Sequence, residues 1–199
     1  MMQRAAFIDR DGVINEDREY VYRIADFQFI RGSVDALRKL REAGYLLVVI
    51  TNQSGIGRGL FSEADYHQLD AHMRRCLSAA GVSLDSVQYC PHLPDAKVAQ
   101  YRRDCECRKP RAGMIRTAVG MLNIDTSQSI LIGDRKADLE AGRAAGVGRC
   151  FLVRSGRPLS DGDVRLADGV YEDLAQCVDE LLMDSDGTAG SPDTPRRAQ

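Results

Sequence analysis

The chain has 199 residues, of which 44% are hydrophobic and 28% are charged, as in an ordinary globular protein with one full core. Its 27 Lys and Arg residues face 29 Asp and Glu residues, and the net charge of −2 argues against a nucleic-acid or membrane-surface protein. No apolar run approaches the ~20 residues of a membrane span, and no signal-peptide core is visible near the N-terminus. We therefore expect a cytoplasmic protein. We also expect a monomer, because no predicted helix carries a clear exposed apolar stripe.

Short apolar runs alternate with helical patterns along residues 1–182. Strands are predicted at 5–8, 45–51, 87–89, 129–132 and 150–153. Helices are predicted at 33–43, 62–80, 114–122, 137–145 and 170–182. This alternation predicts a Rossmann-like, doubly wound α/β domain with a parallel sheet covered on both faces. Residues 183–199 carry almost no large apolar side chain and are predicted to form a disordered tail.

Polar residues follow three of the predicted strands, at the point where each strand ends. They are Asp9-Arg10-Asp11, Thr51-Asn52-Gln53 and Gly133-Asp134. In parallel α/β sheets the ligand lies beyond the carboxyl ends of the strands, so these segments are expected to converge on one site.

Asp9 and Asp11 place two carboxylates close together after a buried strand, and Gly12 permits a sharp turn behind them. Two such carboxylates repel each other unless one is protonated or a cation lies between them. Mg²⁺ suits oxygen ligands of this kind. The alternative for this motif alone is a solvated acidic turn.

Three further motifs suit phosphate chemistry. Thr51 and the amides after it can donate to phosphate oxygens, and Lys109 can neutralise a transferring phosphoryl group. Asp134 can complete a Mg²⁺ site with Asp9, and Asp138 can orient Lys109 or a metal-bound water. Taken singly, the Thr51 motif favours a polar turn and the Lys109 motif an exposed basic pair, and the Asp134 motif also fits an acidic helix N-terminus.

Three of the six cysteines cluster with a histidine in a segment without apolar pattern. The pattern is Cys90-x-His92, twelve residues, then Cys105-x-Cys107. Three thiolates and one imidazole suit a structural, tetrahedral Zn²⁺ that would pin the loop 90–107 and position the Arg108-Lys109 pair behind it. Two unrelated pairs of reduced thiols, or a disulfide formed on oxidation, are the alternatives. The remaining cysteines are predicted to be small buried hydrophobes: Cys76, Cys150 and Cys177.

The order Asp-x-Asp, Thr, Lys, Asp at successive strand ends resembles the haloacid dehalogenase superfamily from about residue 5 to 182. The resemblance implies that Asp9 is a nucleophile that forms a phosphoaspartate and that Asp11 is the general acid and base. It also implies that Thr51 and Lys109 hold the phosphoryl oxygens. Mg²⁺ would be held by Asp9, Asp134 and the backbone carbonyl of Asp11.

Within this superfamily the chain is similar to phosphatases that remove the C7 phosphate of a heptose 1,7-bisphosphate in the synthesis of nucleotide-activated heptose. The resembling segments include 51–59, 90–92, 105–110 and 152–156. Histidinol-phosphate phosphatases are the nearest alternative, but the long zinc loop and the segment 17–21 favour the heptose enzymes. A catalytically silent phosphosugar-binding or zinc-stabilised interaction protein is the alternative from another class.

The resemblance implies a small phosphosugar as the partner. No large cap domain is expected, because fewer than twenty residues separate Asn15 from the first predicted helix and the zinc loop is the other insertion. The expected substrate-binding residues are Arg10, Asp17, Arg18, Glu19, Tyr20, Asn52, Gln53, Ser54, Arg108 and Arg135. Arg108 would read the second phosphate or a sugar hydroxyl, since arginine binds bidentately. Val13 and Arg135 depart from the commoner family pattern, which leaves the nucleophile, the acid/base and the metal ligands intact.

Overall fold

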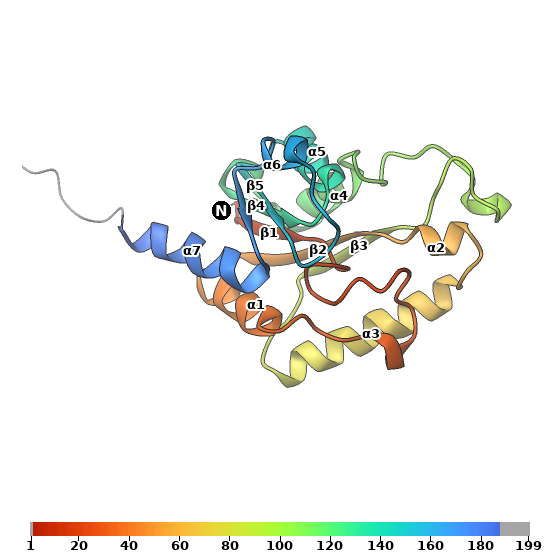
Figure 1. Cartoon of the computed structure of the whole chain (residues 1–199), viewed down its shortest axis with the longest axis horizontal. Helices are drawn as coiled ribbons and strands as arrows, with labels where there is room; N and C mark the ends of the chain where they lie inside the picture. The colour runs from red at the N-terminus through yellow and green to blue at the C-terminus, as the bar shows by residue number, and fades with distance from the viewer. Residues whose placement is uncertain (1, 188–199) are drawn as a thin grey trace, which may run out of the picture.

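The computed structural model describes residues 2–187, and its centre is a parallel sheet of six strands (Figure 1). The strands are β1 (Ala5–Ile8), β2 (Leu46–Asn52), β3 (Ser86–Cys90), β4 (Ile130–Gly133), β5 (Arg149–Val153) and β6 (Gly169–Tyr171). Their order is β3-β2-β1-β4-β5-β6, and every neighbouring pair is parallel. The predicted parallel α/β fold is therefore confirmed.

Helices cover both faces of the sheet, as Figure 1 shows with the sheet seen nearly edge-on. One face packs on α1 (Ser33–Glu42), α3 (Glu63–Ala79) and α7 (Leu174–Gly187), and the other on α4 (Gly113–Leu122) and α5 (Lys136–Ala144). Residues of β1 alternate between these two cores: Ala6 and Ile8 join the first, Ala5 and Phe7 the second. This alternation explains why the strand is apolar at every position. The remaining helices are short: α2 (Ser54–Gly57), α6 (Asp161–Val164) and the 3-10 turns Ile24–Asp26, Ala99–Tyr101 and Thr126–Gln128.

The C-terminal part differs from the prediction at both ends of the last helix. Val170 and Tyr171 belong to β6 rather than to the helix, since Val170 pairs with Leu152 of β5. A β-branched and an aromatic residue side by side suit a strand. Helix α7 then continues to Gly187, past the predicted start of the tail at residue 183. Residues 188–199 of that predicted tail lie outside the described residues.

The strand order creates a crevice at the carboxyl edge of the sheet. The chain leaves β1 toward β2 on one side and returns to β4 on the other, so β1 and β4 flank the point where the winding reverses. In doubly wound sheets this is where ligands bind. Asp9 follows β1 and Asp134 follows β4, which places both carboxylates beside this crevice.

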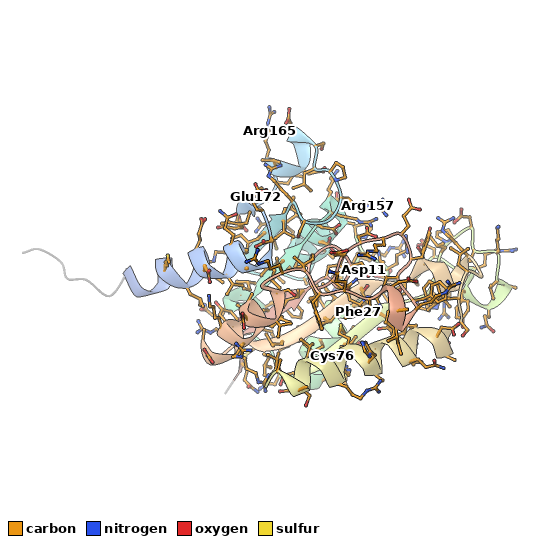
Figure 2. All side chains as sticks on the ribbon, turned by 60° about the horizontal axis from the view of Figure 1, so that its bottom comes forward. Asp11, Phe27, Cys76, Arg157, Arg165 and Glu172 are labelled. Atoms are coloured by element: carbon orange, nitrogen blue, oxygen red, sulfur yellow. The ribbon has the colours of Figure 1, made fainter. Side chains whose placement is uncertain are left out.

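Two long loops lie at this edge, and in the described chain neither forms a separate cap domain. Residues 9–32 connect β1 to α1 and contain one 3-10 turn; residues 91–112 connect β3 to α4 and contain another. Phe27 anchors the first loop on α3, where its ring centroid lies 5.9 Å from that of His72 (Figure 2). Among residues 2–187, no helix is long and apolar enough to cross a membrane.

Candidate active site

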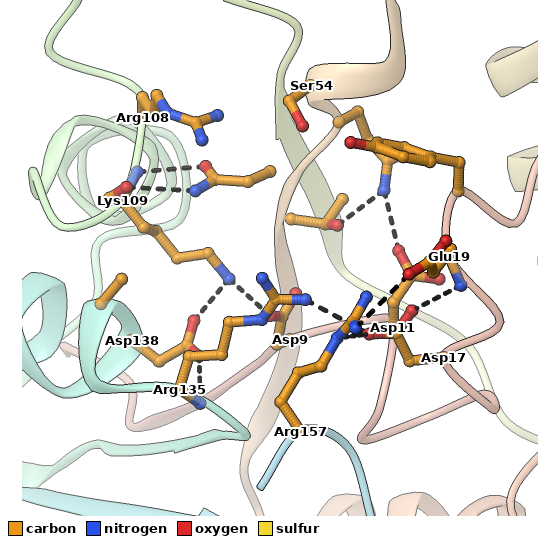
Figure 3. Close-up of a pocket in the computed structure, with 15 residues that line it drawn as sticks. Asp9, Asp11, Asp17, Glu19, Ser54, Arg108, Lys109, Arg135, Asp138 and Arg157 are labelled. Atoms are coloured by element: carbon orange, nitrogen blue, oxygen red, sulfur yellow. Dashed lines mark hydrogen bonds and ion pairs between the residues drawn. The ribbon is translucent and has the colours of Figure 1, made fainter. Parts of the chain in front are cut away.

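A polar cavity of about 340 Å³ opens at the carboxyl edge of the sheet (Figure 3). Twelve residues predicted for the site line it: Asp9, Asp11, Asp17, Glu19, Tyr20, Thr51, Asn52, Gln53, Ser54, Arg108, Lys109 and Arg135. Ala137, Asp138 and Arg157 complete the lining. The motifs after β1 and β2 therefore meet in this cavity, and Asp134 after β4 does not line it but lies close to Asp9.

Lys109 lies between two carboxylates at the floor of the cavity. Its Nζ is 2.9 Å from Asp9 Oδ2 and 2.5 Å from Asp138 Oδ1, and it donates to the carbonyl oxygen of Ile50 at 2.8 Å. Only 4% of the lysine is exposed, so water screens these ion pairs weakly. The two carboxylates raise the pKa of Lys109 despite its burial. The lysine is therefore a fixed positive charge beside Asp9.

Burial also changes the proton affinity of the carboxylates around it. The pKa of Asp9 is raised to about 8, chiefly by desolvation and then by the nearby Asp138 and Asp134, while Lys109 acts in the opposite direction. The pKa of Asp134 is raised to about 6 by desolvation and by Asp138. A cation bound between Asp9 and Asp134 would restore their ionised forms.

The carboxylates of Asp9, Asp134 and Asp138 form a cluster whose oxygens lie within 4.8 Å of one another. Asp138 is already engaged, because it pairs with Lys109 and accepts from the amide of Arg135 at 3.0 Å. Asp134 is completely buried, and its Oδ1 accepts no hydrogen bond from the described residues, although Arg135 Nε lies 3.6 Å from it. Two hard oxygen ligands with one unsatisfied buried atom fit Mg²⁺.

Two glycines allow the backbone to close around Asp134. A Cβ at Gly12 would lie 2.7 Å from Asp134 Oδ2, and one at Gly156 would lie 2.2 Å from the same atom. Gly12 also has a φ of +84°, a backbone conformation that residues with a side chain rarely adopt. Ser155 Oγ donates to the carbonyl of Gly12 at 2.8 Å. The loop after β5 is thus packed directly against the turn after β1.

Asp11 is held by three side chains and lies outside the carboxylate cluster of Asp9, Asp134 and Asp138. Arg10 donates from Nε and Nη2 to Asp11 Oδ1 at 3.2 and 3.0 Å, and from Nη2 to Oδ2 at 2.9 Å. Asn15 Nδ2 and Gln53 Nε2 add bonds of 2.9 and 3.1 Å. Asp11 therefore lines the cavity in a fixed orientation beside Asp9.

Two of the predicted substrate contacts lie outside the cavity. Arg10 is only 1% exposed, and its Nη2 also donates to the carbonyl of Val21, so it supports Asp11 from beneath instead of facing a substrate. Arg18 is exposed and pairs with Glu16 and Gln28. In a turn as tight as 9–12, adjacent side chains leave in different directions, which sequence order does not reveal.

Backbone and amide contacts fix the phosphate-binding candidates. Asn52 and the backbone of Lys109 exchange two hydrogen bonds of 3.1 Å, which tie the end of β2 to the start of the 109–112 turn. Gln53 Nε2 donates to Thr51 Oγ1 at 2.9 Å. Thr51 is 1% exposed yet lines the cavity, and its hydroxyl proton is left to donate to a ligand there.

Arg157 is the charged lining residue that the sequence interpretation missed. Its Nε lies 2.7 Å from Asp17 Oδ2, and its amide donates to Asp134 Oδ2 at 3.1 Å. It directly follows the segment 152–156, which resembles the superfamily, and stands beyond the end of β5. The strand-end rule, applied to β5 as to the other strands, is the signal that would have found it.

The predicted zinc ligands meet at one point beside the active site. Cys90 Sγ lies 3.5 Å from Cys105 Sγ and 3.2 Å from Cys107 Sγ, and His92 Nδ1 lies 3.6 and 3.2 Å from Cys90 Sγ and Cys107 Sγ. In a tetrahedral site with Zn–S bonds of about 2.3 Å, the sulfurs would be about 3.8 Å apart. All these cysteines are free thiols. The cluster has the ligand types and compactness of a structural zinc site.

The thiol cluster is connected to the phosphate-binding segment through a single turn of chain. Arg108 follows Cys107, and its Nη1 donates to the carbonyl of His92 at 3.3 Å. The carbonyl of Cys105 accepts from Arg111 Nη1 at 3.1 Å. The predicted zinc ligands at the two ends of the loop therefore help to fix the positions of Arg108 and Lys109.

Comparison with known proteins identifies the family. A HAD-hydrolase-like family model matches residues 106–177. The D-glycero-β-D-manno-heptose-1,7-bisphosphate 7-phosphatase of Escherichia coli K12 is 46% identical over 171 residues, 86% of this chain and 90% of that one. The protein of the same name from Pasteurella multocida is 45% identical over 174 residues, 87% and 94% of the two chains. The structure of the D,D-heptose 1,7-bisphosphate phosphatase from B. bronchiseptica, complexed with magnesium and phosphate, superposes with a TM-score of 0.76 at 32% identity and covers 91% of this chain and 99% of that one. With the motifs after β1 and β2 in one cavity and this identity over most of its length, the chain belongs to the D-glycero-β-D-manno-heptose-1,7-bisphosphate 7-phosphatases of the haloacid dehalogenase superfamily.

Proposed function

We propose that the chain is a Mg²⁺-dependent phosphatase that removes the C7 phosphate of D-glycero-β-D-manno-heptose 1,7-bisphosphate, in the synthesis of nucleotide-activated heptose. The observation that carries the proposal is the ion pair between Asp9 and Lys109 at the floor of a polar cavity that Asp11 also lines. Relatives with 45–46% identity carry this activity in their names, and those names specify the β-anomer, which the sequence alone leaves open.

Asp9 acts as the nucleophile. Its carboxylate oxygen attacks phosphorus in line, the bond from phosphorus to the C7 oxygen breaks, and a phosphoaspartate forms. Lys109 and the Thr51 hydroxyl hold the phosphoryl oxygens, where negative charge is concentrated. Because the ammonium of Lys109 is already fixed by Asp138, it needs no reorganisation as the reaction proceeds.

Asp11 moves the protons in both half-reactions. It gives a proton to the departing C7 oxygen, and it then takes one from the water that attacks the phosphoaspartate. That attack releases inorganic phosphate and restores Asp9. The bonds from Arg10, Asn15 and Gln53 keep the Asp11 carboxylate in one orientation during both steps.

Asp9 and Asp134 would hold Mg²⁺, together with the backbone carbonyl of Asp11. The bound cation supplies positive charge that offsets the repulsion between the Asp9 carboxylate and the incoming phosphate. The neighbouring structure that contains magnesium and phosphate supports this choice of cation.

The sugar and its second phosphate lie toward the outer wall of the cavity. Arg108, beside Lys109, binds the second phosphate bidentately. Around it, polar side chains from three loops bind the sugar: Glu19, Tyr20, Asn52, Gln53, Ser54 and Arg135, with Asp17 paired to the two arginines at the edge of this group. Zn²⁺ at Cys90, His92, Cys105 and Cys107 is structural, because four side chains leave no open coordination position.

The two alternatives are less well supported. A histidinol-phosphate phosphatase is disfavoured by the relatives, which act on a heptose bisphosphate by name. A catalytically silent binding protein would have no chemical need for both Asp9 and Asp11 in the cavity. We place the enzyme in the cytoplasm, since three thiols at zinc-binding distance need reducing conditions. That it acts as a monomer stays a prediction.

Phosphate release in the presence of Mg²⁺ tests the proposal. The substrates are the β- and α-anomers of heptose 1,7-bisphosphate, fructose 1,6-bisphosphate and histidinol phosphate. We expect the highest kcat/KM with the β-anomer. Turnover of none of the four would contradict the enzyme, whereas preference for histidinol phosphate would contradict the substrate alone.

A further inference from the structure

Asp17 ties the long loop after β1 to the opposite wall of the cavity. Its carboxylate is 8% exposed, and its Oδ2 contacts Arg157 Nε at 2.7 Å and Arg135 Nη2 at 3.2 Å (Figure 3). These two arginines follow β5 and β4, so a single carboxylate joins three segments that are far apart in the sequence. Such a shared, charge-assisted contact fixes geometry more strongly than an isolated surface pair.

The loop residues next to Asp17 are held in an unusual backbone conformation. Glu19 and Tyr20 both have positive φ values, 55° and 57°, and neither is glycine. The amide of Glu19 donates to Asp17 Oδ1 at 3.0 Å. Left-handed backbone at two consecutive side-chain-bearing residues is costly and persists only where surrounding contacts maintain it. Those contacts run through Asp17, and they direct Glu19 and Tyr20 into the cavity lining.

Arg157 stands on a rigid base. Its amide is bonded to Asp134, the preceding Gly156 packs against that carboxylate, and Ser155 donates to the carbonyl of Gly12. The floor of the active site therefore fixes the backbone of Arg157, from which its side chain extends to Asp17. The same guanidinium also reaches the carboxylate of Glu19 at 4.0 Å.

We infer that Arg157 is a positioning residue for substrate specificity, which acts through Asp17 to hold the loop 17–21 in its sugar-binding conformation. The ligand of that loop is a polyhydroxylated phosphosugar, whose hydroxyls donate to the Glu19 carboxylate and bond the Tyr20 hydroxyl. The inference rests on the proposed function for the identity of the sugar. The contacts of Asp17 with Arg157 and Arg135 do not depend on that identity.

A kinetic comparison between two substrates tests the inference. For Arg157→Ala, kcat/KM for the heptose bisphosphate should fall about tenfold more than kcat/KM for p-nitrophenyl phosphate, mainly through KM, as expected for loss of one partly exposed charged contact. Arg157→Lys should recover part of the loss. Arg154→Ala is the matched control, because Arg154 lies on the same loop and pairs only loosely with Glu172, at 3.7 Å. An equal fall for both substrates would overturn the inference.

A double-mutant cycle shows whether Arg157 acts through Asp17. In the Asp17→Ala background, Arg157→Ala should change kcat/KM for the heptose bisphosphate by less than about twofold, because the contact is already lost. A full tenfold effect in both backgrounds would mean that Arg157 contacts the substrate itself, and it would overturn the inference.

Hydrogen exchange separates this inference from the proposed function. Amides of residues 17–21 should exchange faster in Arg157→Ala than in the wild type or Arg154→Ala, with or without substrate. Unchanged exchange would overturn the role of Arg157 in holding the loop 17–21, even if the enzyme is a heptose phosphatase. Faster exchange in a protein without phosphatase activity would support the role of Arg157 in holding the loop, while the proposed function would be wrong.

Discussion

Lys109 Nζ and Asp9 Oδ2 lie 2.9 Å apart at the floor of the cavity, with both side chains almost completely buried. The lysine comes from the end of the zinc loop and the aspartate from the end of β1, so the contact joins the two halves of the site. The buried ammonium of Lys109 offsets the cost of burying the carboxylates of Asp9 and Asp138. In the proposed mechanism it also binds the incoming phosphate.

Replacing Lys109 should therefore affect both catalysis and stability. Lys109→Met removes the positive charge beside the transferring phosphoryl group, and we expect kcat to fall by about 10²–10³. It also leaves Asp9 and Asp138 without their shared partner, so Tm should decrease in magnesium-free buffer. Lys136→Ala is the control, since Lys136 is half-exposed and pairs with Glu140 on the surface of α5. Equal kcat values for the wild type and Lys109→Met would contradict the assigned role.

The carboxylate pKa values predict how pH affects the magnesium-free protein. Asp9 is raised to about 8 and Asp134 to about 6, both above their ordinary value of 3.8. A carboxyl with a raised pKa in the folded state contributes stability that is complete below about pH 4 and is lost as the pH rises through its folded pKa. The magnesium-free protein should thus become less stable between about pH 4 and 8.

Magnesium should remove this dependence, because it favours the ionised carboxylates. The increase in Tm on adding Mg²⁺ should be larger at pH 8 than at pH 5, and Asp9→Asn should reduce the difference. Magnesium is best removed by exchange into metal-free buffer, since a chelator would also attack the thiol cluster. An increase in Tm that is the same at both pH values would contradict the ionisation scheme.

Loss of a zinc ligand should disorder the loop that positions Arg108 and Lys109. Cys105→Ser should abolish stoichiometric zinc binding, measured by metal analysis, and reduce kcat/KM about 10–100-fold, as expected for loss of a metal that orders a catalytic segment. Cys76→Ser is the matched control, because Cys76 lies on α3 (Figure 2), outside the thiol cluster, and its Sγ is 3.5 Å from His72 Nε2. Full activity of a zinc-free protein would contradict the structural role.

Arg108 should distinguish bisphosphate from monophosphate. For Arg108→Ala, we expect kcat/KM for heptose 1,7-bisphosphate to fall about tenfold, while kcat/KM for heptose 7-phosphate changes little. Only the bisphosphate carries the second phosphate that the Arg108 guanidinium binds bidentately. The ratio of the two kcat/KM values is the measurement. An unchanged ratio would show that the second phosphate binds elsewhere.

The sequence predicted the centre of the site because strand ends in a parallel sheet meet at one edge. Asp9 follows β1, Thr51 lies at the end of β2 and Lys109 lies in the loop between β3 and α4. All three line the same cavity, as expected. The cysteine spacing likewise brought four ligand atoms within reach of one metal ion.

The outer parts of the site depend on directions that spacing does not determine. Arg10 lies between two cavity-lining aspartates, but its side chain turns inward to Asp11 and Val21. Arg157 lies past the last residue of a recognisable motif, and its importance emerges only from its contact with Asp17, 140 positions away. Val170 suits a strand and a helix equally well by apolar pattern, and pairing with β5 decides it.

Phosphorus NMR of the reaction with D-glycero-β-D-manno-heptose 1,7-bisphosphate tests the central claim most directly. With Mg²⁺ present, the wild type should convert the C7 phosphate signal into inorganic phosphate while the C1 phosphate signal persists. Asp9→Asn, which lacks the nucleophile, should leave both signals intact. Loss of the C1 phosphate, or turnover by Asp9→Asn at the wild-type rate, would contradict the account.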